Sequence, residues 1–432
     1  ERPVRAGRSP PSPQKEAPAA GAQRRDPRRP WRSCGGEWGP LMKMDRRRRA
    51  RNPVPAVGAA PGRGGLARAS ARLTVSPVMA NAASPASLRD SGPAAPGDRA
   101  VSAWLLLVCG MIAAMAVIGA ITRLTESGLS IMEWAPVTGV LPPMAQAEWE
   151  RLFALYQQTA EYQRLNPDMT LAGFKTIFWW EWVHRLWGRL IGVVFAAGAV
   201  WLGVRGKLRR GLWPHLVALF ALGGLQGAVG WFMVASGFAE RTDVSQYRLA
   251  LHLSAALAIY VYALWLAIRL GAPVPAASAD ARPVRRALWA VTGLVALTIL
   301  AGAFTAGLNA GLIYNTYPLM AGRVVPGEYL ARTPMWLNNF ENMAAVQFNH
   351  RVLAHLTVAA AVAVWLWGRR CALAPAARRA LGYLAAGAGG QLLLGVAALL
   401  AQVPIWLGAA HQAGAIAVLT LTVWALTRVR PV

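Results

Sequence analysis

The sequence predicts an all-α polytopic membrane protein, in which eight transmembrane helices form two pseudo-symmetric four-helix bundles. Hydrophobic residues make up 55% of the 432 residues and charged residues only 15%, a balance typical of membrane proteins. From Val101 onward, eight apolar segments have about the ~20 residues that a helix needs to cross the hydrocarbon layer. They cover residues 101–121, 177–204, 213–235, 248–270, 287–307, 344–368, 380–401 and 407–427.

The two halves of this region repeat one another. Thr122 and Gly128 match Thr305 and Gly311, the pair His184 and Arg185 matches His350 and Arg351, Gln226 and Gly230 match Gln391 and Gly395, and His252 matches His411. Four helices, a loop and four more helices predict parallel repeats related by an axis along the membrane normal. We therefore place an N-terminal bundle at 100–271, a cytoplasmic linker at 272–286 and a C-terminal bundle at 287–428.

The loops between the segments alternate in charge. Basic residues gather in loops 205–211, 269–286 and 369–379, which the positive-inside rule places in the cytoplasm. Both termini are then cytoplasmic, and the long loops 122–176 and 308–343 face the other side, the periplasm in a bacterium. These long loops carry Trp and Tyr residues, which is typical of segments at the membrane surface.

Residues 1–99 read as a disordered basic extension, rich in Pro, Gly, Ala and Arg without periodicity. They hold 20 Lys+Arg and 7 Asp+Glu, a net +13 of the +26 of the whole chain. The first residue is Glu1, which suggests an upstream start translated in error, with Met79, Met42 or Met44 as the true start. A mitochondrial transit peptide is the rival explanation, although the many prolines disfavour the amphipathic helix that it needs.

The composition also limits the class of function. Nucleic-acid binding is disfavoured, because the basic residues after position 99 lie in short loops between apolar segments. Cys34, Cys109 and Cys371 are far apart and form no CxxC pair, so neither a disulfide framework nor a zinc site is indicated. Cys109 lies in an apolar segment and is expected to be a small buried residue.

Four histidines lie at matching places in the apolar segments, namely His184, His252, His350 and His411. Counting 1.5 Å per residue from the segment ends puts each pair at one depth, in the outer half of the membrane. Neutral imidazole is a good ligand for haem iron, and polar groups within a bilayer usually have a function. Two depth-matched pairs therefore predict two haem sites, the alternative being hydrogen-bonded core histidines.

The halves differ one helical turn before the first histidine of each pair. Glu181 precedes His184, whereas Gln347 stands at the equivalent position before His350. A carboxyl can exchange protons or hold a reactive substrate group and an amide cannot, so different tasks are indicated. The alternative is an interfacial Glu181 that pairs with Arg185 or Arg189.

Arginines and two further histidines complete the set of polar candidates. Arg185 and Arg351 each follow a predicted ligand and could pair with haem propionates, and Arg189 could do so or reach the surface. His215 is expected to be interfacial. His355 lies five residues after His350 and so faces away from it.

Several stretches resemble the haem A synthase family, whose members convert haem O to haem A for cytochrome oxidase. The resemblance covers about residues 101–428 and rests on GAITRLTESGLSIMEWAPVTGVLPP (119–143), FKTIFWWEWVHRLWGRLIG (174–192), LGGLQGAVGWFMVASG (222–237), LALHLSAAL (249–257), AGLNAGLIYNTYPLMAG (306–322), VQFNHRVLAH (346–355) and AAHQAGA (409–415).

The resemblance implies the roles of individual residues. It implies that substrate haem lies near His184 and His252 and that a b-type haem is bound by His350 and His411. It also implies that Glu181 is catalytic. Some members have a cysteine pair in the first outer loop, and residues 122–176 contain none, so this chain is similar to the subtype without it.

The resemblance further implies a reaction and partners. The C8 methyl group of haem O is oxidised to a formyl group, with molecular oxygen or water as the co-reactant and an electron donor that the sequence does not identify. Haem O synthase and oxidase assembly factors are the implied protein partners, beside membrane lipid, and a homo-oligomer stays open. The implied location is the bacterial inner membrane, with the mitochondrial inner membrane as the alternative.

Two other functions fit the histidines alone. A di-haem b-type electron carrier explains all four, although it does not explain why Glu181 differs from Gln347. A haem transporter or chaperone is the other alternative, since repeats also mark transporters.

Overall fold

The computed structural model describes residues 96–432 apart from 239–240 and 274. In these residues the structure is helical, and its β-structure is limited to two isolated β-bridges. Eight helices are long and apolar enough to cross a membrane, which confirms the all-α, eight-helix prediction. They are α1 (Pro96–Leu124), α4 (Leu171–Val204), α5 (Trp213–Val234), α6 (Gln246–Gly271), α7 (Ala281–Gly307), α9 (Met343–Arg370), α10 (Pro375–Leu400) and α11 (Ile405–Arg428). Most of the predicted basic extension, residues 1–95, lies outside the described residues.

Some helices begin before the apolar segment that marks them in the sequence. α4 begins at Leu171, six residues before the predicted 177, where the Thr170 side chain accepts a hydrogen bond from Gly173 N at 3.3 Å. α7 begins at Ala281, so residues 281–286, placed in the linker by hydropathy, are helical. Hydropathy detects the longest apolar run of a helix, and it misses the turns before a polar interruption, which is Lys175 and Thr176 in α4 and Arg285 and Arg286 in α7.

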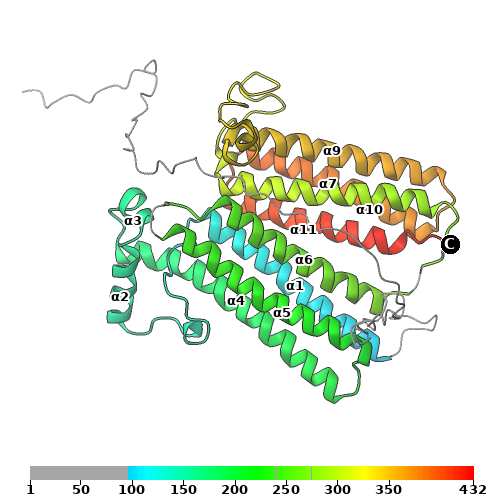
Figure 1. Cartoon of the computed structure of the whole chain (residues 1–432), viewed down its shortest axis with the longest axis horizontal. Helices are drawn as coiled ribbons and strands as arrows, with labels where there is room; N and C mark the ends of the chain where they lie inside the picture. Colours follow the sequence, from blue (N-terminus) through cyan, green and yellow to red (C-terminus); the bar gives the residue numbers. More distant parts are fainter. Residues whose placement is uncertain (1–95, 239–240, 274) are drawn as a thin grey trace, which may run out of the picture. The chain divides into compact units, whose positions relative to one another are not determined.

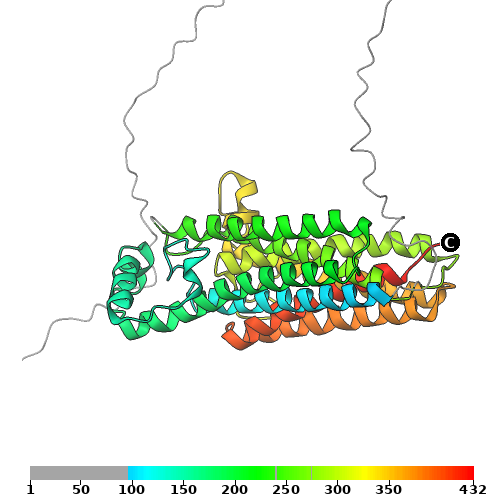
Figure 2. The same cartoon turned by 90° about the horizontal axis from the view of Figure 1, so that it is seen from below.

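The same ring of helix contacts occurs in both halves. α1 and α5 each pack against α4 and α6, and in the second half α7 and α10 each pack against α9 and α11. The halves meet through α1 and α6 on one side and α7 and α11 on the other (Figures 1 and 2). Each half is therefore a closed four-helix unit with the helices in the same order.

The apolar core lies toward one end of these helices. Its largest cluster of buried side chains draws on all eight spanning helices, and on α1 it runs from Val101 to Cys109. On α6, which runs the opposite way, it extends from Leu257 to Leu270. The cluster thus gathers at the end where α1 begins. The four predicted ligand histidines lie nearer the other end, where α4, α6, α9 and α11 begin.

The segment between α1 and α4 forms a cap at the end where α4 begins (Figure 1). It contains α2 (Gln146–Tyr156) and α3 (Ala160–Leu165). Trp149 and Tyr156 of α2 are buried in one cluster with Phe174 and Phe178 of α4. The rings of Trp149 and Phe178 meet edge to face, with centroids 4.8 Å apart. Aromatic packing therefore fixes this predicted surface loop to α4.

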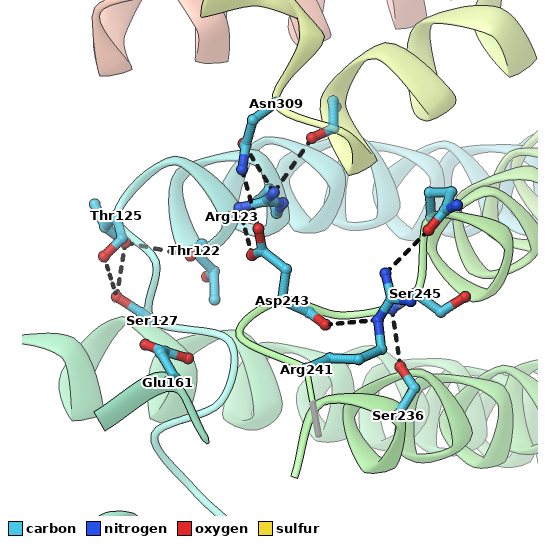
Figure 3. Close-up of polar contacts among 12 residues, drawn as sticks. Thr122, Arg123, Thr125, Ser127, Glu161, Ser236, Arg241, Asp243, Ser245 and Asn309 are labelled. Atoms are coloured by element: carbon cyan, nitrogen blue, oxygen red, sulfur yellow. Dashed lines mark hydrogen bonds and ion pairs between the residues drawn. The ribbon is translucent and has the colours of Figure 1, made fainter. Parts of the chain in front are cut away.

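A ring of polar contacts joins the two halves at the capped end (Figure 3). Arg123, in the last turn of α1, forms an ion pair with Asp243 (Nη1–Oδ1 3.3 Å) in the segment before α6. Arg123 Nη2 donates to Asn309 Oδ1 at 2.9 Å, and Asn309 Nδ2 donates to Asp243 Oδ2 at 3.0 Å. Because Asn309 lies two residues after the end of α7, the contacts tie three segments from both halves together.

The cap contains a buried acid whose ionisation should make stability depend on pH. The pKa of Glu161, at the start of α3, is raised to about 8. Burial is the main cause, a hydrogen bond from Tyr156 Oη opposes it, and the nearby Asp243, Glu126 and Glu181 add to it. The folded protein therefore keeps a proton that the unfolded chain releases above its ordinary pKa of 4.5. Folding is then progressively destabilised as pH rises from about 4.5 to about 8.

We therefore expect Glu161→Gln to raise the unfolding temperature of the detergent-solubilised protein at pH 8. At pH 4.5 the difference in unfolding temperature should be small, because the side chain at position 161 is then neutral in the folded original protein as well as in the folded variant. Thermal unfolding at several pH values measures this difference. An equal effect at both pH values would contradict the buried neutral acid.

Candidate functional sites at the two histidine pairs

The structure brings the predicted ligands of the second half together. His350 lies on α9 and His411 on α11, and their ring centroids are 6.4 Å apart with the planes at 88°. In the first half, His184 lies on α4 and His252 on α6, the helices that correspond to α9 and α11. The structure thus brings the second predicted pair into ring contact and places the first pair on the matching helices.

The spacing of the second pair fits one metal ion between two imidazoles. A metal–nitrogen bond of about 2.0–2.1 Å, with the nitrogen about 1.1 Å from the ring centre, separates the ring centres by about 6.3 Å. In the part of the chain that the structure describes, no group of three or more His, Cys, Asp or Glu side chains could hold a metal. Iron would therefore need the nitrogens of a porphyrin in addition to these histidines.

Each of the four imidazoles lies against a glycine of a neighbouring helix. A methyl group added at these glycines would sit 2.7–3.0 Å from the Cε1 atom of the facing ring, tighter than nearly all Cβ contacts in proteins. The pairs are Gly119 with His184, Gly230 with His252, Gly302 with His350, and Gly395 with His411. The absence of a side chain lets each ring occupy this place, so the glycines set the position of the imidazoles.

A glutamine supports the second histidine of each pair. Gln226 Nε2 donates to the backbone carbonyl of His252 at 2.8 Å and lies 3.0 Å from its Nδ1. Gln391 does the same to His411, at 2.8 and 3.1 Å. The Oε1 atoms of both glutamines are buried without a partner, so a turned amide could accept from an Nδ1–H group. Such a contact would leave Nε2 available for iron.

The first histidines differ in what their Nδ1 atoms contact. His350 Nδ1 lies 3.1 Å from the backbone carbonyl of Thr298, which can accept only from the Nδ1–H tautomer. His350 Nε2 is then free to bind a metal. His184 Nδ1 is buried and has no hydrogen-bond partner among the residues that the structure describes. A His350 Nδ1–H group that donates to Thr298, and a His184 ring with no partner at Nδ1 among the described residues, are both compatible with haem ligation.

Glu181 is held by four donors. Its Oε2 accepts from Ser130 Oγ and Ile131 N, each at 2.7 Å, and its Oε1 accepts from Arg185 Nε at 3.1 Å and Nη2 at 2.6 Å. The side chain is almost completely buried. The carboxylate therefore fixes the loop after α1 to the helix that carries His184.

Gln347 makes the same attachment with opposite polarity. Its Nε2 donates to the carbonyls of Ala310 at 2.7 Å and Ile313 at 2.6 Å, and its Oε1 accepts from Arg351 Nη2 at 2.9 Å. The first loop offers N–H and O–H donors where the second offers carbonyl acceptors. The difference between Glu181 and Gln347 thus matches a difference in the loop that each one holds.

The two arginines after the first histidines bind loop backbone. Arg185 donates to the carbonyls of Ile131 at 2.6 Å and Glu133 at 2.7 Å. Arg351 donates to those of Tyr314 at 2.6 Å and Thr316 at 2.9 Å. Contact with haem propionates, expected from the sequence, stays a prediction for both.

The remaining polar candidates lie elsewhere. Arg189 donates to the carbonyls of Ala135 and Pro136, and among the described residues Glu181 forms its ion pair with Arg185 instead. His355 is exposed and stacks on Tyr317, whose Oη lies 2.9 Å from His355 Nε2. His215 Nδ1 lies 2.6 Å from the Tyr262 hydroxyl.

Sequence reasoning missed several residues of these sites. It noted Gly230 and Gly395 only as repeat matches, and it did not use Gly119 and Gly302. The signal was present, because both of the latter stand three residues before a matched threonine in the repeat. Ser130 lies in a loop with no periodic signal, so only the fold connects it to Glu181.

Eight spanning helices, with a histidine at the matching place in both halves, define a multi-pass membrane protein built from two repeats. Residues 102–423 match the COX15-CtaA family of cytochrome oxidase assembly proteins. A heme A synthase of Rhodospirillum centenum is 52% identical over 348 residues, which cover 81% of this chain and 92% of the relative. One of Parvibaculum lavamentivorans is 47% identical over 331 residues, 76% of this chain and 94% of the relative. The chain belongs to the haem A synthase family, which confirms the resemblance.

A test of the glycine contacts compares two positions on α10. Gly395→Ala should displace the His411 ring, because the new methyl group would lie 2.7 Å from Cε1, and should reduce the haem bound by the purified protein. Gly390→Ala is the matched control, since its methyl group would meet nothing within 4 Å. Haem content from the pyridine haemochrome spectrum measures both. Equal haem content in the two variants would contradict a positioning role for Gly395.

Proposed function

We propose that this protein is a haem A synthase, which oxidises the C8 methyl group of haem O to a formyl group for cytochrome oxidase. The observation that carries the proposal is the difference between two otherwise matched histidine sites. Both have facing glycines and a supporting glutamine, and only the first has a buried carboxylate one turn before its histidine. The names of the similar relatives support the same function.

The two sites are assigned different haems. Substrate haem O lies between His184 and His252, and a resident haem b lies between His350 and His411. Haem b supplies one-electron chemistry when bound. Arg185 and Arg351 hold the outer loops over the two sites, close enough in sequence to the ligands to meet a propionate as well.

Glu181 is the proposed catalytic group in the first half. Hydroxylation by molecular oxygen consumes protons with electrons, and oxidation with water as the oxygen source releases both. Either route needs a group beside the substrate that exchanges protons. Glu181 lies one turn before His184 and can do so, whereas Gln347 cannot.

The proposal also includes the setting of the enzyme. The 100–271 and 287–428 bundles lie in a bacterial inner membrane with both termini in the cytoplasm, so the histidine pairs are nearer the periplasmic side. Haem O synthase and oxidase assembly factors are the proposed partners, together with an electron donor of unknown class.

The function is tested by extracting haems from cells that make haem O, with and without the full chain. We expect haem A or its hydroxylated precursor to appear only with the chain. Haem b bound to the purified protein, with haem O unchanged, would instead indicate an electron carrier.

Glu181→Gln should leave the haem b site of the second half intact and reduce conversion by about 10²-fold or more, the usual size of a general acid–base contribution. The amide Nε2 then faces a donor group, so the attachment of the first loop is weakened as well. Absorption spectra report the bound haems and chromatography reports haem A. The matched control is Gln347→Glu, which sets a carboxylate against the Ala310 and Ile313 carbonyls and should instead lower haem b content. A normal haem A yield from Glu181→Gln would refute the catalytic role.

His350→Ala and His411→Ala should each abolish the bis-histidine haem b spectrum, because each removes one axial ligand. His184→Ala should leave that spectrum in place, since it affects only the substrate site. Low-temperature optical and electron paramagnetic resonance spectra distinguish the two cases. An unchanged haem b spectrum in His350→Ala would reverse the assignment of the halves.

A further inference from the structure

A groove lies between the two halves at the end where α1 begins and α11 ends, away from the histidine pairs. It has a volume of about 420 Å³, within the ~300–1,000 Å³ typical of small-ligand sites. α1 and α6 form one side and α11 forms the other. The residues that the argument uses are Arg99, Ser102, Leu106, Gly271, Trp424 and Arg428.

The floor of the groove is fixed by close contact between α1 and α6. Ser102 Oγ donates to the Ala267 carbonyl at 2.8 Å. A methyl group added at Gly271 would lie 2.2 Å from Ser102 Oγ, so α1 and α6 are in direct contact here. The groove is therefore a shaped feature of the seam between the halves.

The mouth of the groove carries positive charge that the described protein does not neutralise. Arg99 is exposed, and among the described residues no ion pair or hydrogen bond holds its side chain. Arg428 reaches the Pro273 carbonyl only at 3.4 Å, and within the described part of the chain its buried Nε has no partner. No acidic residue is among the described residues that line the groove, and the neighbouring Asp98 is buried and paired with Arg209.

Below the charged mouth, the wall of the groove is apolar. Leu106 is 47% exposed and lies seven residues after Arg99, so it stands about 10 Å deeper along α1. Trp424 lies one turn before Arg428 on α11, with the guanidinium 6.0 Å from its ring. Cationic groups at the helix ends above an apolar wall match a phosphate headgroup above an acyl chain.

We propose that this groove binds an anionic phospholipid, whose phosphate lies between Arg99 and Arg428 and whose acyl chain lies along Leu106 and Trp424. The lipid fills the seam between the two halves at the end opposite the polar ring of Arg123. The site is separate from the haem sites, and the proposal is independent of the function assigned to them.

The test uses the purified full chain in nanodiscs or detergent, with phosphatidylglycerol and phosphatidylcholine as probes. Native mass spectrometry should show phosphatidylglycerol retained in preference to phosphatidylcholine. The double variant Arg99→Gln/Arg428→Gln should lose about tenfold or more in phosphatidylglycerol affinity, because each removes a cation at the membrane surface. Arg99→Lys/Arg428→Lys should keep most of that affinity.

The matched control is Arg378→Gln/Arg379→Gln, which removes two exposed cations from the first turns of α10, at the same end of the bundle and outside the groove. It should bind phosphatidylglycerol as the unchanged protein does. An equal loss in the control would reduce the effect to general surface charge and overturn the proposal. Competition by glycerol phosphate alone at the same concentration would also overturn it, because the apolar wall would then contribute nothing.

Discussion

The arrangement of the histidine pairs depends on four places where an imidazole lies against a helix backbone. Helices in a membrane gain little from the hydrophobic effect when they associate, so close packing at small residues is a main source of their affinity. Here the small residues are glycines, and the group that packs against each one is a candidate ligand. The same contacts therefore pack the helices together and position the candidate ligands.

Glu181 and Gln347 show how a repeated architecture accommodates a chemical difference. Each side chain anchors an outer loop to the helix that carries the first histidine, and an arginine one turn later completes the attachment. The loop of the first half presents donors, and the loop of the second presents carbonyls. A change of one residue alone would leave a buried group without a partner, at a cost of about 1–3 kcal/mol, so residue and loop have to change together.

Much of the fold followed from hydropathy, because a bilayer permits few structures besides helices and the apolar stretches are long. The histidine pairing followed from the repeat, and the COX15-CtaA match agrees with the motifs around it. The first turns of α4 and α7 were missed, since polar residues separate each of them from the apolar run of its helix. The loop contacts of Glu181 were also missed, because Ser130 and Ile131 are 50 or more residues away along the chain and no periodicity relates them.

The polar ring of Arg123, Asp243 and Asn309 has a consequence for electron movement. It holds the ends of α1 and α7 together, and nearer the middle of the bundle the hydroxyls of Tyr260 and Thr420 meet at 2.7 Å across the same seam. Under the proposed haem assignment, these contacts keep the distance between donor and acceptor constant. Tunnelling between the two haems would then proceed over a path of fixed length.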